Sequence, residues 1–380
     1  MIAELTRNAV DVLPAGGLEE KLKLGRPLRV KLGIDVTAPD VTLGNGIPLQ
    51  RMRAFQDAGH VGVLIVGDYT TRIGDPSGRS AERPMLDPAE IDRNATRFFE
   101  QAATIVDRDR TEVRFNSEWL SNVDFAEILR LTRTVTVARI LERDDFSKRF
   151  AAREPISMSE LLYPLMQAYD SVAVEADVEL GGTDQLYNLL MGREVMQAYG
   201  LQPQVALTVQ YLDSWDGNGM SGSRGNYIGL KEDPAEQFGK TMRIPDELLP
   251  QWYRLIVQDA APGGEPMEAK LALARWIVTR AHGAAAATDA EAHFTRVVRE
   301  GQAPDVVADA VLPDGDPVHM PVALSTAFGI STSEARRLIA QGGVKIEGTV
   351  ATDLDVSRSA LLGRTIQAGK RRFARFHPPA

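Results

Sequence analysis

A strand, a helix and a second strand follow one another within about 40 residues near the start of this 380-residue chain. Residues 28–34 (LRVKLGI) and 61–66 (VGVLIV) are short, rich in branched apolar side chains and bounded by glycine or charge, which is typical of buried strands. Residues 47–58 (IPLQRMRAFQDA) have a helical pattern that ends at Gly59. Strands joined by a helical crossover run parallel, so the sequence predicts an α/β fold with a parallel sheet.

The rest of the chain divides by its composition. Residues 1–232 continue the α/β pattern, with further helices predicted at 88–106, 125–132, 159–169 and 186–198 and a strand at 205–211. Residues 233–302 are rich in alanine and predict a small helical domain, with helices at 247–258, 267–281 and 288–300. Proline, aspartate and glycine mark 303–318 as a linker, and 319–380 form a last module.

Composition excludes several kinds of site. The chain has no cysteine, so thiolate nucleophiles, disulfides and cysteine metal sites are impossible, and its five histidines are dispersed. We therefore expect no metal bound by the protein. No run of about 18 apolar residues occurs, so we expect no membrane span. Glu4 and Asp11 interrupt the apolar pattern of the N-terminal segment, so we expect no signal peptide, and the absence of cysteine favours a cytoplasmic location.

Charge is distributed unevenly along the chain. The formal net charge is −9, yet residues 319–380 carry nine basic and four acidic side chains. A basic module on an acidic body favours a polyanionic partner such as RNA. A merely solvated basic terminus is the alternative on charge alone.

Two loops follow the predicted strands. Residues 31–45 (KLGIDVTAPDVTLGN) lead from the first strand into the helix, and residues 67–83 (GDYTTRIGDPSGRSAER) follow the second. The carboxyl ends of parallel strands, facing helix N-termini, are where open α/β sheets bind phosphate-bearing ligands. Asp75 would lie at this same edge, although ordinary turn chemistry also explains either loop.

One predicted helix carries a polar stripe. Residues 157–160 (SMSE) have capping-box spacing, so a helix should begin there. Tyr163, Gln167 and Asp170 are spaced so that they share one face, among apolar neighbours. Such a stripe suits a pocket for a small polar ligand, with a satisfied structural network as the alternative.

Two further segments are rich in glycine. In residues 178–188 (VELGGTDQLYN) a strand ends in a glycine pair and a helix opens at Asp184 and Gln185, a place where a carboxylate commonly holds ribose hydroxyls. Residues 216–230 (DGNGMSGSRGNYIGL) form a loop able to wrap phosphates through backbone N–H groups, or a plain surface loop.

Taken together and in order, these segments resemble the bacterial tyrosyl-tRNA synthetases, a family of class I aminoacyl-tRNA synthetases. Residues 33–40 (GIDVTAPD) resemble the family's GxDPTAPD, and residues 73–78 (IGDPSG) match it fully. Residues 163–170 (YPLMQAYD) and 181–185 (GGTDQ) also match, and residues 333–344 resemble its small C-terminal RNA-binding module. The resemblance covers essentially the whole chain.

The resemblance implies a fold and a set of site residues. The fold is a Rossmann-type parallel sheet in residues 1–232, with a dimer-forming insertion at about 110–156, an anticodon-recognition helical domain and a small α+β RNA-binding module. The amino-acid site would be Asp75, Tyr163, Gln167, Asp170 and Gln185, with Asp170 accepting a hydrogen bond from the phenol. The nucleotide site would be Gly33, Asp35, Thr37, Gly44, Gly182, Asp184 and Met220. RNA would be bound by Arg336, Arg337 and Lys345.

The catalytic signatures depart from the family pattern. The family has histidines at the positions of Thr42 and Asn45, and lysines at those of Gly219 and Gly222, which is followed by Ser223. Those side chains stabilise charge on the phosphates during activation, and loss of one such donor costs about 10²–10³ in rate. The cations that could substitute are Arg72, Arg79, Arg83 and Arg224.

Three functions remain open at this point. The chain could be a working tyrosine–tRNA ligase that uses ATP with Mg²⁺ and binds tRNA as a homodimer. It could be a relative recruited to join an amino acid to another acceptor in specialised metabolism. It could also be a regulator that binds tyrosine or tRNA without turnover.

Overall fold

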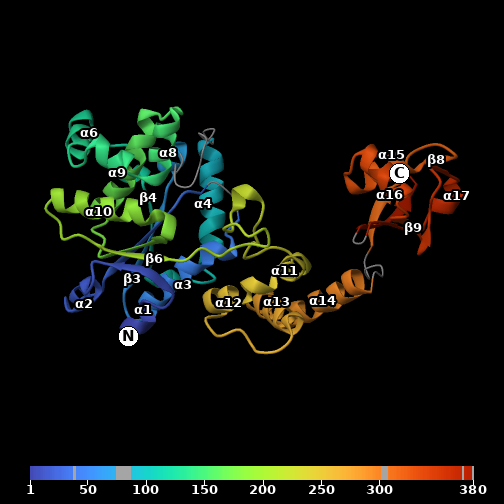
Figure 1. Cartoon of the computed structure of the whole chain (residues 1–380), viewed down its shortest axis with the longest axis horizontal. Coiled ribbons are helices and arrows are strands. Elements are labelled where there is room, and N and C mark those ends of the chain that lie inside the picture. The colour runs from blue at the N-terminus through green and yellow to red at the C-terminus, as the bar shows by residue number, and fades with distance from the viewer. Residues whose placement is uncertain (37–39, 74–86, 301–306, 370–371, 379–380) are drawn as a thin grey trace. The chain divides into compact units, whose positions relative to one another are not determined.

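The computed structural model describes the chain except residues 37–39, 74–86, 301–306, 370–371 and 379–380 (Figure 1). The chain separates into two compact units, residues 1–232 with 243–270 and residues 233–242 with 271–380. The predicted boundary at 232 therefore lies between the units, but residues 243–270 pack with the first unit although the sequence assigned them to the helical domain. Among the described residues, no helix is both long and apolar enough to span a bilayer.

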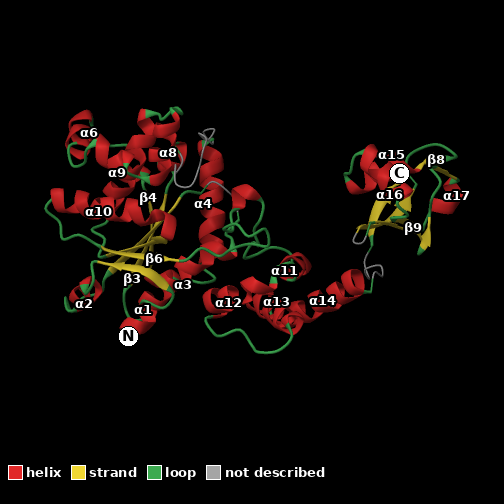
Figure 2. Ribbon diagram, viewed as in Figure 1, coloured by secondary structure: helices red, strands yellow, loops and turns green. Residues whose placement is uncertain are grey.

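A mixed sheet organises the first unit (Figure 2). Six strands in the described part of the chain form it, in the order β1-β6-β5-β2-β3-β4. Their bounds are β1 (Ala9–Leu13), β2 (Arg29–Ile34), β3 (Val61–Val66), β4 (Thr111–Phe115), β5 (Val178–Gly182) and β6 (Val205–Val209). All neighbouring pairs are parallel except β1 and β6. The predicted α/β class and parallel sheet are confirmed, and the strand order changes direction between β2 and β5.

Helices cover this sheet and connect its strands. The principal ones are α3 (Leu43–Asp57), α4 (Pro88–Ala102), α9 (Met158–Ala173) and α10 (Leu186–Ala198). Helix α3 packs on β2, β3 and β5, while α10 packs on β5, β6 and α9. Shorter helices are α1 (Ile2–Leu5), α2 (Gly17–Leu22), α5 (Ser117–Leu120), α6 (Phe125–Thr132), α7 (Val137–Leu141) and α8 (Asp144–Ala152). The predicted bounds of α6 and α10 are confirmed, and α3 begins four residues before the predicted start of its helical pattern.

The predicted helix at 247–258 is wrong as a single element. The chain there forms a short turn (Asp246–Leu248), then α12 (Leu249–Trp252), and then a wide π-helical turn (Tyr253–Val257). Pro250 has no N–H to offer a longer helix, and Gln258 ends the segment in the left-handed conformation with φ of 64°.

The helical part of the second unit has its own small core. Helix α11 (Pro234–Thr241), the later part of α13 (Pro266–His282) and α14 (Ala284–Phe294) pack around Phe238, Val278 and Phe294, and a π-helical turn (Thr295–Arg299) follows.

The basic C-terminal segment folds as an α+β module. Helices α15 (Met320–Phe328), α16 (Thr332–Ala340) and α17 (Arg358–Leu361) accompany a sheet ordered β10-β9-β12-β13-β7 among the described residues. Its strands are β7 (Ala308–Val311), β9 (Val344–Ile346), β10 (Thr349–Val350), β12 (Thr365–Ala368) and β13 (Arg372–His377), and β8 (Val318–His319) pairs separately with β11 (Asp355–Val356). The linker prediction is wrong at 308–311, because β7 pairs in parallel with β13.

Candidate active site

A pocket of about 250 Å³ opens at the carboxyl ends of β2, β3, β5 and β6. This is the edge where the strand order changes direction, the usual ligand position in such sheets. Its lining includes Tyr163, Gln167, Asp170 and Gln185 from the predicted amino-acid site, and Gly33, Asp35, Gly44, Gly182 and Met220 from the predicted nucleotide site. With Thr70 from the loop after β3, residues from five separate sequence segments therefore meet in one cavity.

Other predicted residues are placed differently. Asp184 is exposed outside the lining and accepts a hydrogen bond from Gln185 Nε2 at 3.2 Å. Arg224 is exposed at the end of a short 3₁₀ turn (Gly222–Arg224). Thr37, Asp75, Arg79 and Arg83 lie outside the described residues, as do the side chains of Arg72 and Ser223. The roles proposed for these residues stay predictions.

Asp170 is the most deeply buried of the pocket carboxyls, with 3% of its surface exposed. It accepts hydrogen bonds from Trp119 Nε1 at 2.8 Å and from Asn116 Nδ2 at 3.4 Å. Burial raises its pKa to about 7, against the opposing effects of the Lys31 charge and of these two donors. Near neutral pH the group therefore exchanges between a charged acceptor and a neutral acid.

The Tyr163 hydroxyl is turned to a second carboxyl. It donates to Asp35 Oδ2 at 2.9 Å, and Thr70 Oγ1 donates to Asp35 Oδ1 at 2.8 Å. The loop after β2 and the helix α9 are thereby joined at the mouth of the pocket. The predicted nucleotide residue Asp35 and the predicted amino-acid residue Tyr163 share a hydrogen bond.

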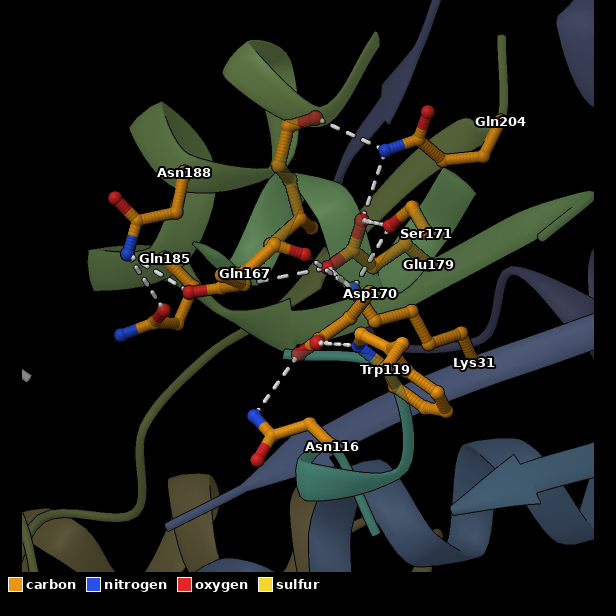
Figure 3. Close-up of polar contacts among 11 residues, drawn as sticks. Lys31, Asn116, Trp119, Gln167, Asp170, Ser171, Glu179, Gln185, Asn188 and Gln204 are labelled. Carbon is orange, nitrogen blue, oxygen red and sulfur yellow. Dashed lines mark hydrogen bonds and ion pairs between the residues drawn. The ribbon is translucent and has the colours of Figure 1, made fainter. Parts of the chain in front are cut away.

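A buried ion pair lies behind the pocket (Figure 3). Lys31 Nζ is 2.8 Å from Glu179 Oε1, and both side chains are at most 2% exposed. Lys31 also donates to Ser171 Oγ at 2.8 Å and to the Gln167 carbonyl at 2.9 Å. Gln204 Nε2 and Ser171 Oγ each donate to Glu179 Oε2 at 2.8 Å. Each charge is thus both paired and hydrogen-bonded, as buried ions require.

A chain of amides links this pair to the opposite end of the pocket. Gln167 Nε2 lies 3.5 Å from Glu179 Oε1, and Asn188 Nδ2 donates to Gln167 Oε1 at 3.1 Å and to Gln185 Oε1 at 3.0 Å. Arg143 Nη1 in turn donates to Asn188 Oδ1 at 3.1 Å. Hydrogen bonds from Asn188 therefore fix the orientation of the side-chain amides of Gln167 and Gln185, and Glu179 lies next to the Gln167 amide (Figure 3).

The altered signature positions at α3 are engaged with each other. Asn45 N donates to Thr42 Oγ1 at 3.1 Å, and Thr42 N donates to Asn45 Oδ1 at 3.0 Å, which is a complete capping box. Thr42 Oγ1 also donates to Asn45 Oδ1 at 2.8 Å. These side chains satisfy the first turn of the helix, and Asn45 still lines the pocket.

The glycine-rich loop that holds the other signature is folded against the same helix. Leu43 N donates to the Ile228 carbonyl at 2.9 Å, and Leu230 N donates to the Val41 carbonyl at 2.7 Å. Inside the loop, Asn226 Nδ2 is 3.0 Å from both carboxylate oxygens of Asp216, and Asn226 Oδ1 accepts from Ser221 N at 2.9 Å. This contact from Asn226 holds the pKa of Asp216 below its ordinary value.

Tyr211 lies against the glycine pair at the end of β5. A Cβ on Gly182 would come within 2.9 Å of the Tyr211 ring and 2.8 Å of Asp184 Oδ1, so a larger residue there would displace these side chains. Tyr211 itself lines the pocket together with Met220. An aromatic ring therefore borders the part of the cavity predicted to take the nucleotide.

The residues that sequence reasoning missed are Trp119, Asn116, Lys31, Glu179 and Asn188. A signal existed for the ion pair: Lys31 precedes Gly33 by two residues and Glu179 precedes Gly181 by two, within two apolar strands. Opposite charges at matched positions of adjacent parallel strands face the same side. No comparable pattern marks Trp119, which reaches Asp170 from a different segment.

The C-terminal module presents part of its predicted RNA site. Arg336 and Arg337 are exposed on α16, and Lys345 is half-buried on β9. Arg336 Nη2 lies 3.2 Å from His319 Nε2. Among the residues that the structure describes, no three histidine, aspartate or glutamate side chains are grouped as a metal site would require.

Comparison with known proteins identifies the family of the chain. The family described as tRNA synthetases class I (W and Y) matches residues 23–298, and the S4 domain matches residues 322–356. The tyrosine–tRNA ligase of Moorella thermoacetica is 47% identical over 98% of this chain and 94% of its own length. That of Geobacter sulfurreducens is 46% identical over 98% of both chains.

Solved structures share the fold. The tyrosyl-tRNA synthetase of Archaeoglobus fulgidus complexed with L-tyrosine has a TM-score of 0.61 at 21% identity, covering 75% of this chain and 98% of its own. That of Aeropyrum pernix has a TM-score of 0.62 at 18% identity, covering 76% and 97%.

The sheet, the pocket at its carboxyl edge and the family match define a class I aminoacyl-tRNA synthetase fold with an S4 domain. Because relatives of 43–47% identity cover nearly the whole chain, it belongs to the tyrosine–tRNA ligase family. The resemblance noted in the sequence is therefore confirmed at the level of family.

Proposed function

We propose that this chain activates tyrosine with ATP and transfers it to tRNA(Tyr). The observation that carries this proposal is the buried acceptor Asp170, held by Trp119 in the cavity that Gln167 and Gln185 also line. A phenolic hydroxyl donating to Asp170 satisfies this carboxyl. Phenylalanine lacks this donor, which would act on Asp170 beside Trp119 and Asn116, and is rejected for that reason.

The amino-acid pocket supplies orientation for the first step. In this step the carboxylate of the bound tyrosine attacks the α-phosphorus of ATP, and pyrophosphate leaves. We assign Tyr163, Gln167 and Gln185, with Asp75, to the ligand's ammonium group. Gly33, Asp35, Gly44, Gly182 and Met220, with Thr37 and Asp184, are assigned to the nucleotide. Mg²⁺ would enter with the ATP phosphates, its usual ligands in such sites.

Charge on the reacting phosphates must be stabilised without the family's signature side chains. Thr42 and Asn45 offer weaker donors than imidazole, and Gly219 and Gly222 offer backbone N–H groups only. We propose that arginines at 72, 79, 83 or 224 supply the missing positive charge, because guanidinium pairs with phosphate in two places at once. The transfer to another acceptor and the non-catalytic regulator are not favoured, since the full-length relatives are ligases.

The remaining parts receive matching roles. We assign the helical region 233–302 to the tRNA anticodon and the module 319–380 to RNA backbone contacts through Arg336, Arg337 and Lys345.

We also propose a homodimer formed through the 110–156 region. Exposed apolar side chains support this surface, namely Phe125 at 72%, Leu129 at 50%, Val137 at 57% and Phe150 at 64%. The compartment would be the cytoplasm, where tRNA is charged.

Two measurements on one sample test the ligase activity. The first is tyrosine-dependent ATP–pyrophosphate exchange beside an authentic tyrosyl-tRNA synthetase, and the second is tyrosine binding by calorimetry. We expect binding, and exchange within about a hundredfold of the control, because arginines only partly replace the lost donors. Tyrosine binding without any exchange contradicts the ligase and leaves a binding protein.

A further inference from the structure

The buried ion pair behind the pocket has no part in the roles assigned so far. We propose that Lys31 and Glu179 are positioning residues that set the charge of Asp170 and the orientation of Gln167, and so determine how strongly the site prefers a phenolic amino acid. This inference rests on the proposed function, because it concerns the amino acid that the same pocket selects.

Geometry places the pair between the two ends of the pocket. Lys31 on β2 and Glu179 on β5 are direct partners in the parallel register, so both side chains project to the side of the sheet where α9 packs. Lys31 Nζ meets Gln167 and Ser171 of α9, the helix that also carries Asp170. Glu179 reaches the Gln167 amide, which Asn188 joins to Gln185 (Figure 3).

Burial makes the charges of this pair effective at Asp170. Both side chains are essentially inaccessible, so water screens them little. The Lys31 charge lowers the pKa of Asp170 and the Glu179 charge raises it, and Lys31 has the larger effect. Without Lys31, the pKa of Asp170 is expected to rise, so that the carboxyl keeps its proton to higher pH. A neutral acid that lacks the phenolic donor when phenylalanine is bound is penalised less than a charged one, so selectivity falls.

Other groups facing Asp170 are few in the described part of the chain. Trp119 and Asn116 donate hydrogen bonds from the segment after β4, and Thr70 contacts Asn116 from the turn after β3. Asp35 is a further carboxylate of the pocket, engaged by Tyr163 and Thr70. Trp119, Asn116 and Thr70 do not titrate between pH 5.5 and 8.5, so Asp35 is the other carboxyl that the pH series has to take into account.

The experiment measures tyrosine and phenylalanine affinity by calorimetry from about pH 5.5 to 8.5, a range in which the phenol keeps its proton. Wild type is compared with Lys31→Met, Glu179→Gln and the double variant. In wild type we expect tyrosine affinity to rise with pH, with a midpoint at the pH where Asp170 ionises. The pH of this midpoint should be higher in Lys31→Met and in the double variant, and lower in Glu179→Gln. At pH values below the midpoint, each unit of upward shift should reduce the tyrosine preference about tenfold.

The opposite displacement of the two single variants separates charge from simple loosening, which would weaken both alike. The matched controls are Lys21→Met and Asp177→Asn, which break a second buried ion pair of the same unit outside the pocket lining. They should change the melting temperature but leave the midpoint and selectivity unchanged. If Lys31→Met does not fold, the double variant and Glu179→Gln still test the inference. The double variant removes both charges and so leaves no buried ion without a partner.

Two results overturn the inference in distinguishable ways. If wild type binds tyrosine and the midpoint is the same in all folded variants, the inference is wrong and the proposed function stands. If wild type binds no tyrosine, the proposed function fails and the inference fails with it.

Discussion

Asp170 combines a recognition role with an energetic cost. Its pKa in the folded chain is raised to about 7, above the ordinary value for aspartate. A carboxyl with a raised folded-state pKa destabilises the fold once the pH exceeds its unfolded pKa, and the full cost is reached only above the folded one. The side chain therefore opposes folding most strongly at pH values above about 7.

This cost can be measured with Asp170→Asn. We expect the melting temperature of the variant to increase relative to that of wild type as the pH rises from 5 to 8. Tyrosine binding should be lost. Thermal unfolding at several pH values provides the test. A pH-independent difference would mean that Asp170 is not the group that titrates.

Trp119 supplies the shortest hydrogen bond to this carboxyl. Trp119→Phe removes the donor but keeps an aromatic ring, so the pKa of Asp170 should rise and tyrosine affinity at pH 7 should fall by about tenfold, a typical cost for a hydrogen bond to a charged group. Calorimetry measures the change, and Trp276→Phe on α13 is the control. Equal affinities in Trp119→Phe and wild type would contradict this role.

At the scale of elements, the glycine-rich loop and the start of α3 form one backbone-bonded structure. The positions at which the family places imidazole and ammonium groups are here used to cap a helix or left without side chains. A lysine can be returned to one of them, because a Cβ on Gly219 finds its nearest neighbour, the Tyr211 side chain, only at 3.9 Å.

Gly219→Lys should therefore fold and raise the rate of ATP–pyrophosphate exchange. We expect an increase of about tenfold or more, since one well-placed donor to a developing charge is worth about 10²–10³. Gly219→Met has a similar length without the charge and is the matched control. An equal rate in both variants would show that this position does not reach the phosphates.

Several elements were predictable because their signals are local. The strands at 61–66 and 178–182, the capping box at Ser157, and helix α10 follow from periodicity and capping residues. Strand β7 was not predictable, because its sequence ADAV has no alternating apolar pattern and it forms only by pairing with β13. Helix α9 showed its polar face in the sequence, but the partners of that face, Trp119 and Lys31, come from distant segments.

At the scale of the whole molecule, the exposed apolar side chains on α6 to α8 are typical of a surface that packs against another protein. We expect Phe125→Asp combined with Leu129→Asp to convert the proposed dimer into a monomer, because the interface would then bury carboxylates of both protomers without partners. Sedimentation equilibrium measures this, with Met267→Asp as the control at another exposed apolar site. A monomeric wild type would refute the proposed dimer.

The basic module is expected to bind tRNA mainly through phosphates. Arg336→Gln combined with Arg337→Gln should weaken tRNA binding and reduce the slope of log affinity against log salt by about 2, one for each lost phosphate contact. Arg53→Gln on α3, where Arg53 pairs with Asp57, is the control. An unchanged slope would place the RNA contacts elsewhere.

The Lys31–Glu179 pair also bears on how the sheet finds its pairing. A slip of one residue between β2 and β5 would turn one of these side chains to the opposite face of the sheet and leave two buried ions without partners. Breaking such a pair costs roughly 3–5 kcal/mol, a large part of the stability of a typical domain. The lost ion pair thus raises the free energy of misaligned pairings of β2 and β5. The residues proposed to tune selectivity therefore also favour the correct register of these strands.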